Sequence, residues 1–318
     1  MGRRRRSNGL DERDVQRATR AFLSLDARLQ LIVIAILVVG GIVYWISRTR
    51  TQQPGQPPAR EGTVARSQQP PTASPAASEQ LLLGNPSGAT HDLGSRSNYL
   101  MLKPYYALSY NDSLGTPNWV SWRVTKLDLG TAPRKQMFDP DITLPPGFYR
   151  VTHKDYSGSG YDRGHLCPHS DRAATDEMSF ATFVMTNIIP QAPNVNQKGW
   201  ADLEEYCRTL VKREHDRLYI VSGRAGSKGT IARGKVDVPA ECWKVVVVVP
   251  EAGGEDDLAK INTSTRVISI RMPNEQDVST NWKQYRVTPA EIEHATGYQF
   301  FDRVPAEIAQ VLRQKMDR

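Results

Sequence analysis

Residues 162–165 read Asp-Arg-Gly-His and place a histidine two positions after an arginine. An unperturbed histidine titrates near pH ~6.5, and neighbouring positive charge lowers that pKa, so a neutral imidazole that can accept a proton exists at physiological pH. The arginine guanidinium binds anionic oxygens through a fork of N–H donors. A base that can deprotonate water, next to an anion-binding arginine, suits the cleavage of a phosphodiester.

More polar residues follow along the chain. Asn187–Gln191 leads to Asn196 and then to Trp200–Glu204. Together with Asp162–His165, this set resembles the DNA/RNA non-specific endonuclease family, which includes endonuclease G. The resemblance extends from residue 81 to residue 301 and takes in the segments 85–90, 106–111 and 218–223. It implies an α+β fold of the ββα-metal (His-Me finger) type, with a central antiparallel sheet flanked by helices.

The resemblance also implies roles for three side chains. The family's general base falls on His165, its metal-binding asparagine on Asn196, and the carboxylate that holds the metal's waters on Glu204. Glu205 is the neighbour that could be confused with Glu204, but the spacing from Trp200 favours Glu204. These oxygen ligands suit Mg²⁺, which keeps several waters, and Mn²⁺ can substitute because it favours a similar oxygen shell.

Two arginines match family residues that contact the substrate phosphate. Arg208 follows Glu204 by four residues, on the same face of a helix, so an ion pair between the two is the alternative interpretation. Arg134 lies in a loop and could equally be solvated surface. A guanidinium that never deprotonates fits the negative charge of a phosphoryl group under attack.

Arg163 and Asn187 complete the predicted site. Arg163 either binds phosphate or braces its loop against Asp162 or Asp171. Asp162 is assigned to structure, because a metal-ligand interpretation requires a second nearby carboxylate and none is obvious. Asn187 matches a family position near the base, and we expect it to position that base. The predicted catalytic residues are therefore His165, Arg163, Arg134, Arg208 and Asn187, and the predicted metal ligands are Asn196 and Glu204.

Other chemistries fit the sequence less well. The segment His165–His169 could suggest a zinc cluster, but Pro168 breaks a helix and no second ligand pair lies at a recognisable spacing. A thiol protease would need a nucleophile-turn signature, which accompanies neither Cys167 nor Cys207. Only 3 cysteines occur, so there is no disulfide framework. Buried free thiols are favoured, and a bridge between Cys167 and Cys207 is the alternative for an exported domain.

Apolar periodicity predicts the elements that position these residues. Branched and aromatic runs predict strands at 99–110, 118–124, 218–222, 243–249 and 265–271. The run 243–249 is apolar enough for burial on both faces. Helices are predicted at 197–212, after a cap at Thr288, and at 304–315. Residues 81–318 are sized for a single core and are predicted to form the endonuclease domain.

The N-terminal region predicts a membrane anchor. From Leu29 to Ser47 no residue is charged, and nineteen residues at about 1.5 Å each nearly match a hydrocarbon core of ~30 Å. A signal peptide is the alternative, but no Ala-x-Ala-like cleavage site follows. Arginines concentrate before the span, which places residues 1–28 in the cytoplasm and the domain on the outer side, periplasmic or extracellular. Acidic residues within 1–28 argue against an organelle-targeting peptide. Residues 48–80, rich in Pro, Gln and Ser, are predicted to be a disordered linker.

The chain's charge is uneven. The net charge is +7, from 41 basic and 34 acidic residues, but residues 1–80 hold 12 arginines and 6 acidic residues. The remainder is therefore close to neutral, and overall basicity is no argument that the folded part binds nucleic acid.

These observations predict a membrane-anchored, metal-dependent, non-specific endonuclease of DNA and RNA. Two alternatives stay open: a non-catalytic nucleic-acid-binding module at the membrane surface, and an exported nuclease toxin with an inhibitor protein. The oligomeric state is open too, and a homodimer is among the possibilities.

Overall fold

The computed structural model describes Asp26 and residues 79–251 and 256–318. Apart from Asp26 and residues 79–80, the predicted cytoplasmic segment, membrane span and linker lie outside these ranges and stay predictions. Within the described ranges, no helix combines the length and apolar composition that crossing a bilayer requires.

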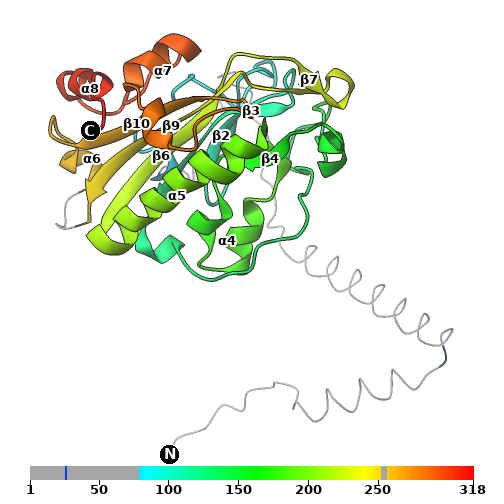
Figure 1. The fold of residues 1–318 in the computed structure, drawn as a ribbon, viewed down its shortest axis with the longest axis horizontal. Coiled ribbons are helices and arrows are strands. Elements are labelled where there is room, and N and C mark those ends of the chain that lie inside the picture. Colours follow the sequence, from blue (N-terminus) through cyan, green and yellow to red (C-terminus); the bar gives the residue numbers. More distant parts are fainter. Residues whose placement is uncertain (1–25, 27–78, 252–255) are drawn as a thin grey trace, which may run out of the picture. The chain divides into compact units, whose positions relative to one another are not determined.

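A six-stranded sheet forms the centre of the fold (Figure 1). All neighbouring strands are antiparallel, which confirms the predicted central antiparallel sheet. In spatial order the strands are β1 (Tyr99–Leu102), β2 (Ala107–Asn111), β3 (Thr116–Val124), β6 (Asp216–Ala225), β9 (Glu241–Pro250) and β10 (Arg266–Pro273). Two further pairs are small: β4 (Asp162–His165) with β5 (Ile188–Gln191), and β7 (Thr230–Ile231) with β8 (Val236–Asp237).

The predicted strand 99–110 is wrong as a single strand, because it divides into β1 and β2. Pro104 has no amide hydrogen to give to a ladder, and the chain turns back there. The turn is closed by the amide of Lys103, which donates to the carbonyl of Tyr106 over 2.9 Å. The other four predicted strands are found, with ends that differ by a few residues.

One long helix and several short ones surround the sheet. The helices are α4 (Asp176–Ala181), α5 (Trp200–Thr209), α6 (Asp257–Lys260), α7 (Pro289–Thr296) and α8 (Ala306–Arg313). Turns of π-helix at Val195–Gly199 and Leu210–Glu214 extend α5 at both ends, and residues 193–194 are helical as well, so the predicted helix 197–212 runs from 193 to 214. The predicted cap of α7 is confirmed, since Thr288 and Glu291 form a reciprocal capping box. Short 3-10 turns lie at Lys126–Asp128, His153–Tyr156, His169–Arg172, Met185–Asn187, Ala232–Gly234 and Trp282–Tyr285.

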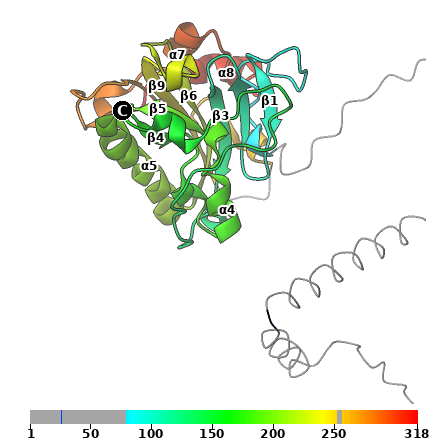
Figure 2. The same ribbon diagram turned by 90° about the vertical axis from the view of Figure 1, so that its right-hand side faces the viewer.

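The two faces of the sheet carry separate cores. Figures 1 and 2 show α5 against one face and α7 and α8 against the other. Successive residues of a strand point to opposite faces. Val246 and Val248 of β9 accordingly join the core beneath α5, whereas Val245 and Val247 join the core beneath α7 and α8. Burial of β9 on both faces explains its nearly continuous apolar sequence.

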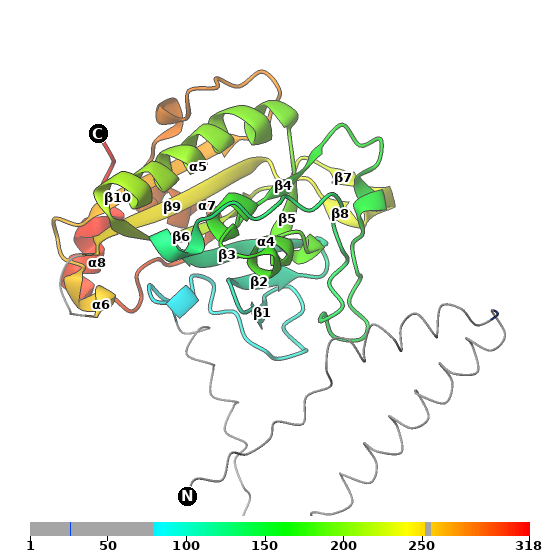
Figure 3. The ribbon, with the colours of Figure 1, turned by 90° about the horizontal axis from the view of Figure 1, so that it is seen from below.

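The strands β4 and β5 form a two-stranded unit on the α5 side of the sheet (Figure 3). They pair antiparallel, with His165 opposite Ile188 and Asp162 opposite Gln191. The helical segment that carries Asn196 follows closely after β5 in the chain. The order strand, strand, helix, which the family resemblance implied around His165 and Asn196, is therefore present.

Candidate active site

The imidazole of His165 lies at the end of β4 and is only 8% exposed. Phe183 meets it edge to face, with ring centroids 4.7 Å apart, and Phe138 packs at 5.2 Å. Its Nε2 atom is buried and has no hydrogen-bond partner among the described residues. Nδ1 is consequently the ring nitrogen left to meet a water or a substrate.

This environment keeps the imidazole neutral. Burial, and then the charges of Arg134 and His169, lowers the pKa of His165 to about 3. Each effect disfavours the imidazolium: burial removes water from the cation, and two groups of like charge repel it. At physiological pH the ring is therefore unprotonated and able to accept a proton.

Asn187 braces the chain that follows His165. Its side-chain oxygen accepts the amide of Cys167 over 3.0 Å, and its side-chain nitrogen donates to the carbonyls of Cys167 and Thr182 at 2.8 and 2.9 Å. The side chain is fully buried. Asn187 thus fixes the backbone that follows His165, and its buried side chain is not exposed to a substrate.

Gly164 allows β4 and β5 to approach closely. A Cβ atom at this position would lie 1.9 Å from Oε1 of Gln191, on the strand that pairs with β4. A side chain here would have to displace the side chain of Gln191, which is fully buried.

Asn196 starts the helical segment and contacts the beginning of β4. Its side-chain nitrogen donates to Oδ2 of Asp162 over 2.8 Å, and the side chain of Gln197 donates to the same oxygen over 2.8 Å. Because a carboxylate only accepts, the amide nitrogen of Asn196 must face Asp162. The amide oxygen of Asn196 accepts no hydrogen bond from the described residues, so it is available to a cation. Asp162, assigned to structure from the sequence, orients the predicted ligand.

Glu204 points inward from α5. Its side chain is 13% exposed, and Oε1 accepts a bond of 3.1 Å from Nζ of Lys244 on β9. Burial raises the pKa of Glu204, with Lys244 acting in the opposite direction. The alternative residue, Glu205, is 61% exposed and forms ion pairs with Arg208 and Lys212. Glu204 is therefore the glutamate that faces the interior of the site.

Arg208 has partners other than those considered from the sequence. It donates to Asp171 over 3.0 Å and to Glu205 at 3.1 and 3.0 Å. The described residues show no ion pair between Arg208 and Glu204, so that alternative interpretation is wrong. Asp171 is held in turn by the indole N–H of Trp122 at 3.0 Å. The pairing with Asp171 fixes the guanidinium next to the loop that follows His165.

Two exposed arginines lie over aromatic rings. The guanidinium of Arg134 is 5.1 Å from the ring centre of Phe183, and that of Arg163 is 5.0 Å from the ring centre of Phe138. These are the two rings that enclose His165. Neither arginine has an ion-pair partner in the described part of the chain, so the predicted brace of Arg163 against Asp162 or Asp171 is wrong. Both guanidiniums are free to bind an anion.

The side chains beside His165 share one electrostatic environment. Burial and the charges of Arg134 and Arg208 lower the pKa of His169. The same Arg134 lowers the pKa of His165, and Arg208 opposes the rise that burial causes in the pKa of Glu204. The structure thus brings together the predicted base, carboxylate and arginines, and Asp162 ties Asn196 to the strand that carries His165.

The oxygens available at this site suit a hydrated hard cation. In the described ranges, no group of three or more His, Cys, Asp or Glu residues could hold a metal by itself. The acceptors left free are the amide oxygen of Asn196 and Oε2 of Glu204. Mg²⁺ retains most of its waters and needs few protein ligands, so this set fits it, whereas structural zinc needs four tight N or S ligands. The three cysteines are free and buried, as the sequence favoured.

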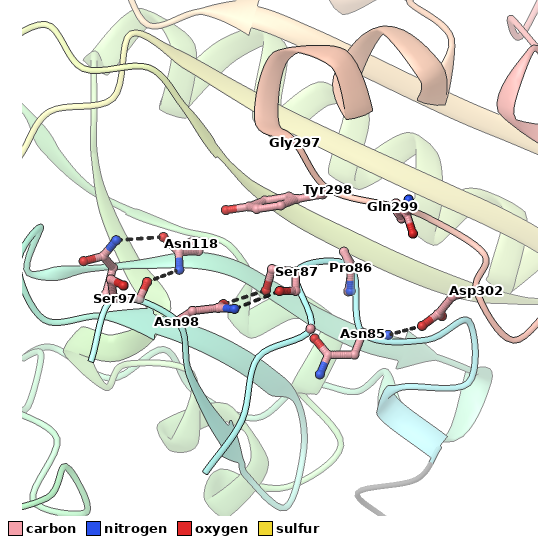
Figure 4. Close-up of a pocket in the computed structure, with 12 residues that line it drawn as sticks. Asn85, Pro86, Ser87, Ser97, Asn98, Asn118, Gly297, Tyr298, Gln299 and Asp302 are labelled. Carbon is pink, nitrogen blue, oxygen red and sulfur yellow. Dashed lines mark hydrogen bonds between the residues drawn. The ribbon is translucent and has the colours of Figure 1, made fainter. Parts of the chain in front are cut away.

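A separate cavity of about 620 Å³ contains none of the predicted site residues. Figure 4 shows that asparagines and serines line it, and these side chains bond to one another. Asn98 accepts from Ser87 over 2.7 Å, and Asn118 donates to the carbonyl of Ser97 over 2.8 Å. The bond from Asn118 fastens the segment 85–98 to β3, and a bond of 2.7 Å from the hydroxyl of Ser109 to Asn98 fastens it to β2, so the motif at 85–90 has a structural role.

Sequence reasoning missed two residues of the site. The ring of Phe183 packs against the imidazole of His165 and lies beneath the guanidinium of Arg134. A single aromatic residue in a sequence, however, does not indicate which residues it will contact. Lys244 lies within the run 243–249, which is predicted to be apolar and buried. A charged side chain at a buried position requires a partner of opposite charge. That single polar position in β9 was the available signal.

Comparisons with known proteins show what this chain is similar to. The family model described as DNA/RNA non-specific endonuclease matches residues 83–307. A nuclease from Nostoc sp. is 48% identical over 254 residues, which cover 79% of this chain and 92% of that protein. Nuclease C1 from Cunninghamella echinulata is 31% identical over 250 residues, covering 73% of this chain and 90% of that protein.

A solved structure shares the fold. The crystal structure titled as the EndoG/EndoGI complex, on the mechanism of EndoG inhibition, superposes with a TM-score of 0.59 at 25% sequence identity. The match covers 73% of this chain and 94% of the chain in that structure.

Proposed function

The chain belongs to the DNA/RNA non-specific endonuclease family, and we propose that its activity depends on His165 as general base and on one Mg²⁺ held by Asn196 and Glu204. It is a sugar-non-specific endonuclease, and we propose both DNA and RNA as substrates. The observation that supports this site best is the bond from Asn196 to Asp162, which leaves an amide oxygen free next to the strand that carries His165. Mn²⁺ is expected to replace Mg²⁺ because it favours a similar shell.

His165 acts on the water that attacks phosphorus. Its neutral ring presents Nδ1 as the acceptor for a proton of that water. A base with a pKa near 3 is weak. The negative charge of a bound phosphodiester would offset the positive charge of Arg134. Substrate binding would therefore raise the pKa of His165 and make it a stronger base.

The arginines bind and orient the substrate. Arg134 and Arg163 lie over the two rings that flank His165 and can place a phosphate beside Nδ1. Arg208, fixed by Asp171, supplies a third guanidinium near Glu204. When bound, Mg²⁺ would polarise the phosphoryl group and stabilise charge on the leaving oxygen. Recognition through phosphates carries little sequence information, which explains low specificity.

The test is digestion of supercoiled plasmid and of RNA by the full-length protein, with and without a chelator. His165→Ala should lower cleavage by roughly 10²–10⁴-fold, the usual contribution of a general base. The control is His294→Ala, at an exposed position of α7. Undiminished nicking by a folded His165→Ala variant would refute the base, and chelator resistance would refute the metal.

The two alternatives predict different results. A non-catalytic binding module would bind nucleic acid in a salt-dependent way and would not cleave it in Mg²⁺. An exported toxin would have a dedicated inhibitor. The solved EndoG structure is of an EndoG/EndoGI complex, and an inhibitor protein is the partner that we propose for this chain under this alternative. Co-production with neighbouring gene products, followed by the plasmid assay, separates a toxin from a scavenging nuclease.

We also propose that residues 29–47 anchor the protein, with the N-terminus in the cytoplasm and the nuclease domain outside, in the periplasm or extracellular space. The uncharged stretch and the preceding arginines support this topology. Protease added to cells whose outer membrane, where present, has been permeabilised should degrade the domain at 81–318. Full protection of the domain would contradict the topology.

A further inference from the structure

Lys244 is a charged residue inside an apolar core. Its side chain is 1% exposed. The other side chains that β9 presents to the same core are Cys242, Val246 and Val248. Burying an ammonium group among such residues is unfavourable unless it is paired. The contacts of Lys244 should therefore show why a lysine, rather than an apolar residue, occupies this position.

The contacts of Lys244 converge on α5. Nζ donates to Oε1 of Glu204 over 3.1 Å, and it lies 4.5 Å from the ring centre of Trp200 and 5.4 Å from that of Trp122. Trp200 precedes Glu204 by four residues and therefore shares its face of the helix. The two rings hold the ammonium from the sides, and Glu204 is the acidic residue with which it pairs.

This arrangement restricts the Glu204 carboxylate. Oε1 is held by a charge-assisted hydrogen bond to a lysine that is itself fixed by two rings. Oε2 accepts no hydrogen bond from the described residues. One oxygen of the carboxylate is therefore committed to the core, and the other is left for a ligand.

We propose that Lys244 is a positioning residue for the cation site, which fixes Glu204 so that its free oxygen faces the ion. This inference rests on the proposed function, since it assigns Glu204 to that site. A purely structural ion pair would stabilise the fold but would leave cation binding unchanged. The two roles therefore differ in a measurable way.

The experiment compares five variants of the full-length protein with the wild type: Lys244→Met, Lys244→Arg, Glu204→Gln, the combination of Lys244→Met with Glu204→Gln, and Lys260→Met. Lys260 is the matched control, because it also forms a largely buried ion pair, with Asp257 at 3.0 Å, and shares no partner with the site. Each protein is measured for its melting temperature without metal, for Mg²⁺ binding by calorimetry, and for the Mg²⁺ concentration that half-saturates plasmid cleavage.

Lys244→Met should weaken Mg²⁺ binding and raise the half-saturating Mg²⁺ concentration, each by about tenfold or more, as expected for a residue that orients a ligand. Lys260→Met should leave both unchanged. In the Glu204→Gln background, Lys244→Met should cause no further loss, because Lys244 acts through Glu204. Lys244→Arg, which keeps the charge, should recover part of the binding.

A folded Lys244→Met variant with wild-type Mg²⁺ binding would overturn the inference. So would a double variant clearly weaker in binding than Glu204→Gln alone, and this comparison decides the matter if Lys244→Met does not fold by itself. If instead the wild type lacks Mg²⁺-dependent cleavage, the proposed function fails. Cleavage by the wild type together with unaltered binding in Lys244→Met would sink only the role of Lys244.

Discussion

Asp162 accepts a hydrogen bond of 2.8 Å from the side chain of Asn196, and this contact joins the first residue of β4 to the start of the long helical segment. The two residues are separated by 34 positions in the chain. The bond determines which atom of the Asn196 amide is free, because a carboxylate can only accept. Asp162 consequently controls the orientation of the predicted metal ligand without needing to bind the metal.

Replacing Asp162 should therefore impair the cation site. We expect Asp162→Ala to raise the Mg²⁺ requirement for cleavage by roughly 10- to 100-fold, the usual effect of removing a partner that orients a ligand. Gln197→Ala is the control, since it removes the other bond to the same carboxylate oxygen and leaves Asn196 in place. Equal effects of the two substitutions would show that the Asn196 contact has no special importance.

The buried imidazole of His165 should make stability depend on pH. In the unfolded chain the ring takes a proton near pH ~6.5, whereas the folded ring stays neutral down to about pH 3. Between these values the unfolded state binds the extra proton. Stability is therefore complete above pH ~6.5 and falls on acidification, by up to about 1.4 kcal/mol per pH unit from this residue.

Urea unfolding at pH 7 and pH 5 measures this contribution. Glutamine does not titrate, so His165→Gln should lose less unfolding free energy between the two pH values than the wild type does. If both proteins lose the same amount, the ring is not held neutral in the folded state.

Phe183 should affect catalysis more than stability. Leucine is similar enough in volume to keep the core filled, but it offers no aromatic face to Arg134 and no edge contact to His165. We expect Phe183→Leu to lower the cleavage rate by about tenfold, which corresponds to roughly 1.4 kcal/mol. Phe180→Leu is the matched control, because Nζ of Lys135 lies 5.6 Å from the ring centre of Phe180, a similar cation–ring contact in the same region. A comparable loss of activity in both variants would contradict a specific role for Phe183.

The three cysteines should be unreactive in the folded protein. All are buried and free, and burial raises the pKa of Cys207 and Cys242 to about 12 and that of Cys167 further. The thiolate is the reactive form, so a thiol reagent such as dithionitrobenzoate should react with none of them until the protein is unfolded. Unfolding without reductant should then expose 3 thiols. A shortfall of two would indicate a disulfide.

Local sequence patterns predict much of the fold. Apolar alternation located the strands of the sheet, and the Thr288 cap with Pro289 located α7, because strand pairing and capping depend on neighbouring residues. The strand break at Pro104 was missed, although it is a local signal too. The motif 162–165 was recognisable as a base beside an arginine, whereas Asn196 and Glu204 were assigned through the resemblance to the endonuclease family.

The contacts that complete the site could be decided only by the tertiary structure. Arg208 pairs with Asp171, 37 positions away, and Glu204 pairs with Lys244, 40 positions away. Helical spacing had left an ion pair between Glu204 and Arg208 as the alternative to phosphate contact. Residue types and local periodicity thus determined which elements form and which side chains can do chemistry. Which charged side chains pair with each other depended on the register of β9 in the sheet and on how α5 packs against the sheet. Local patterns encode neither, because both result from burying the whole apolar face at once.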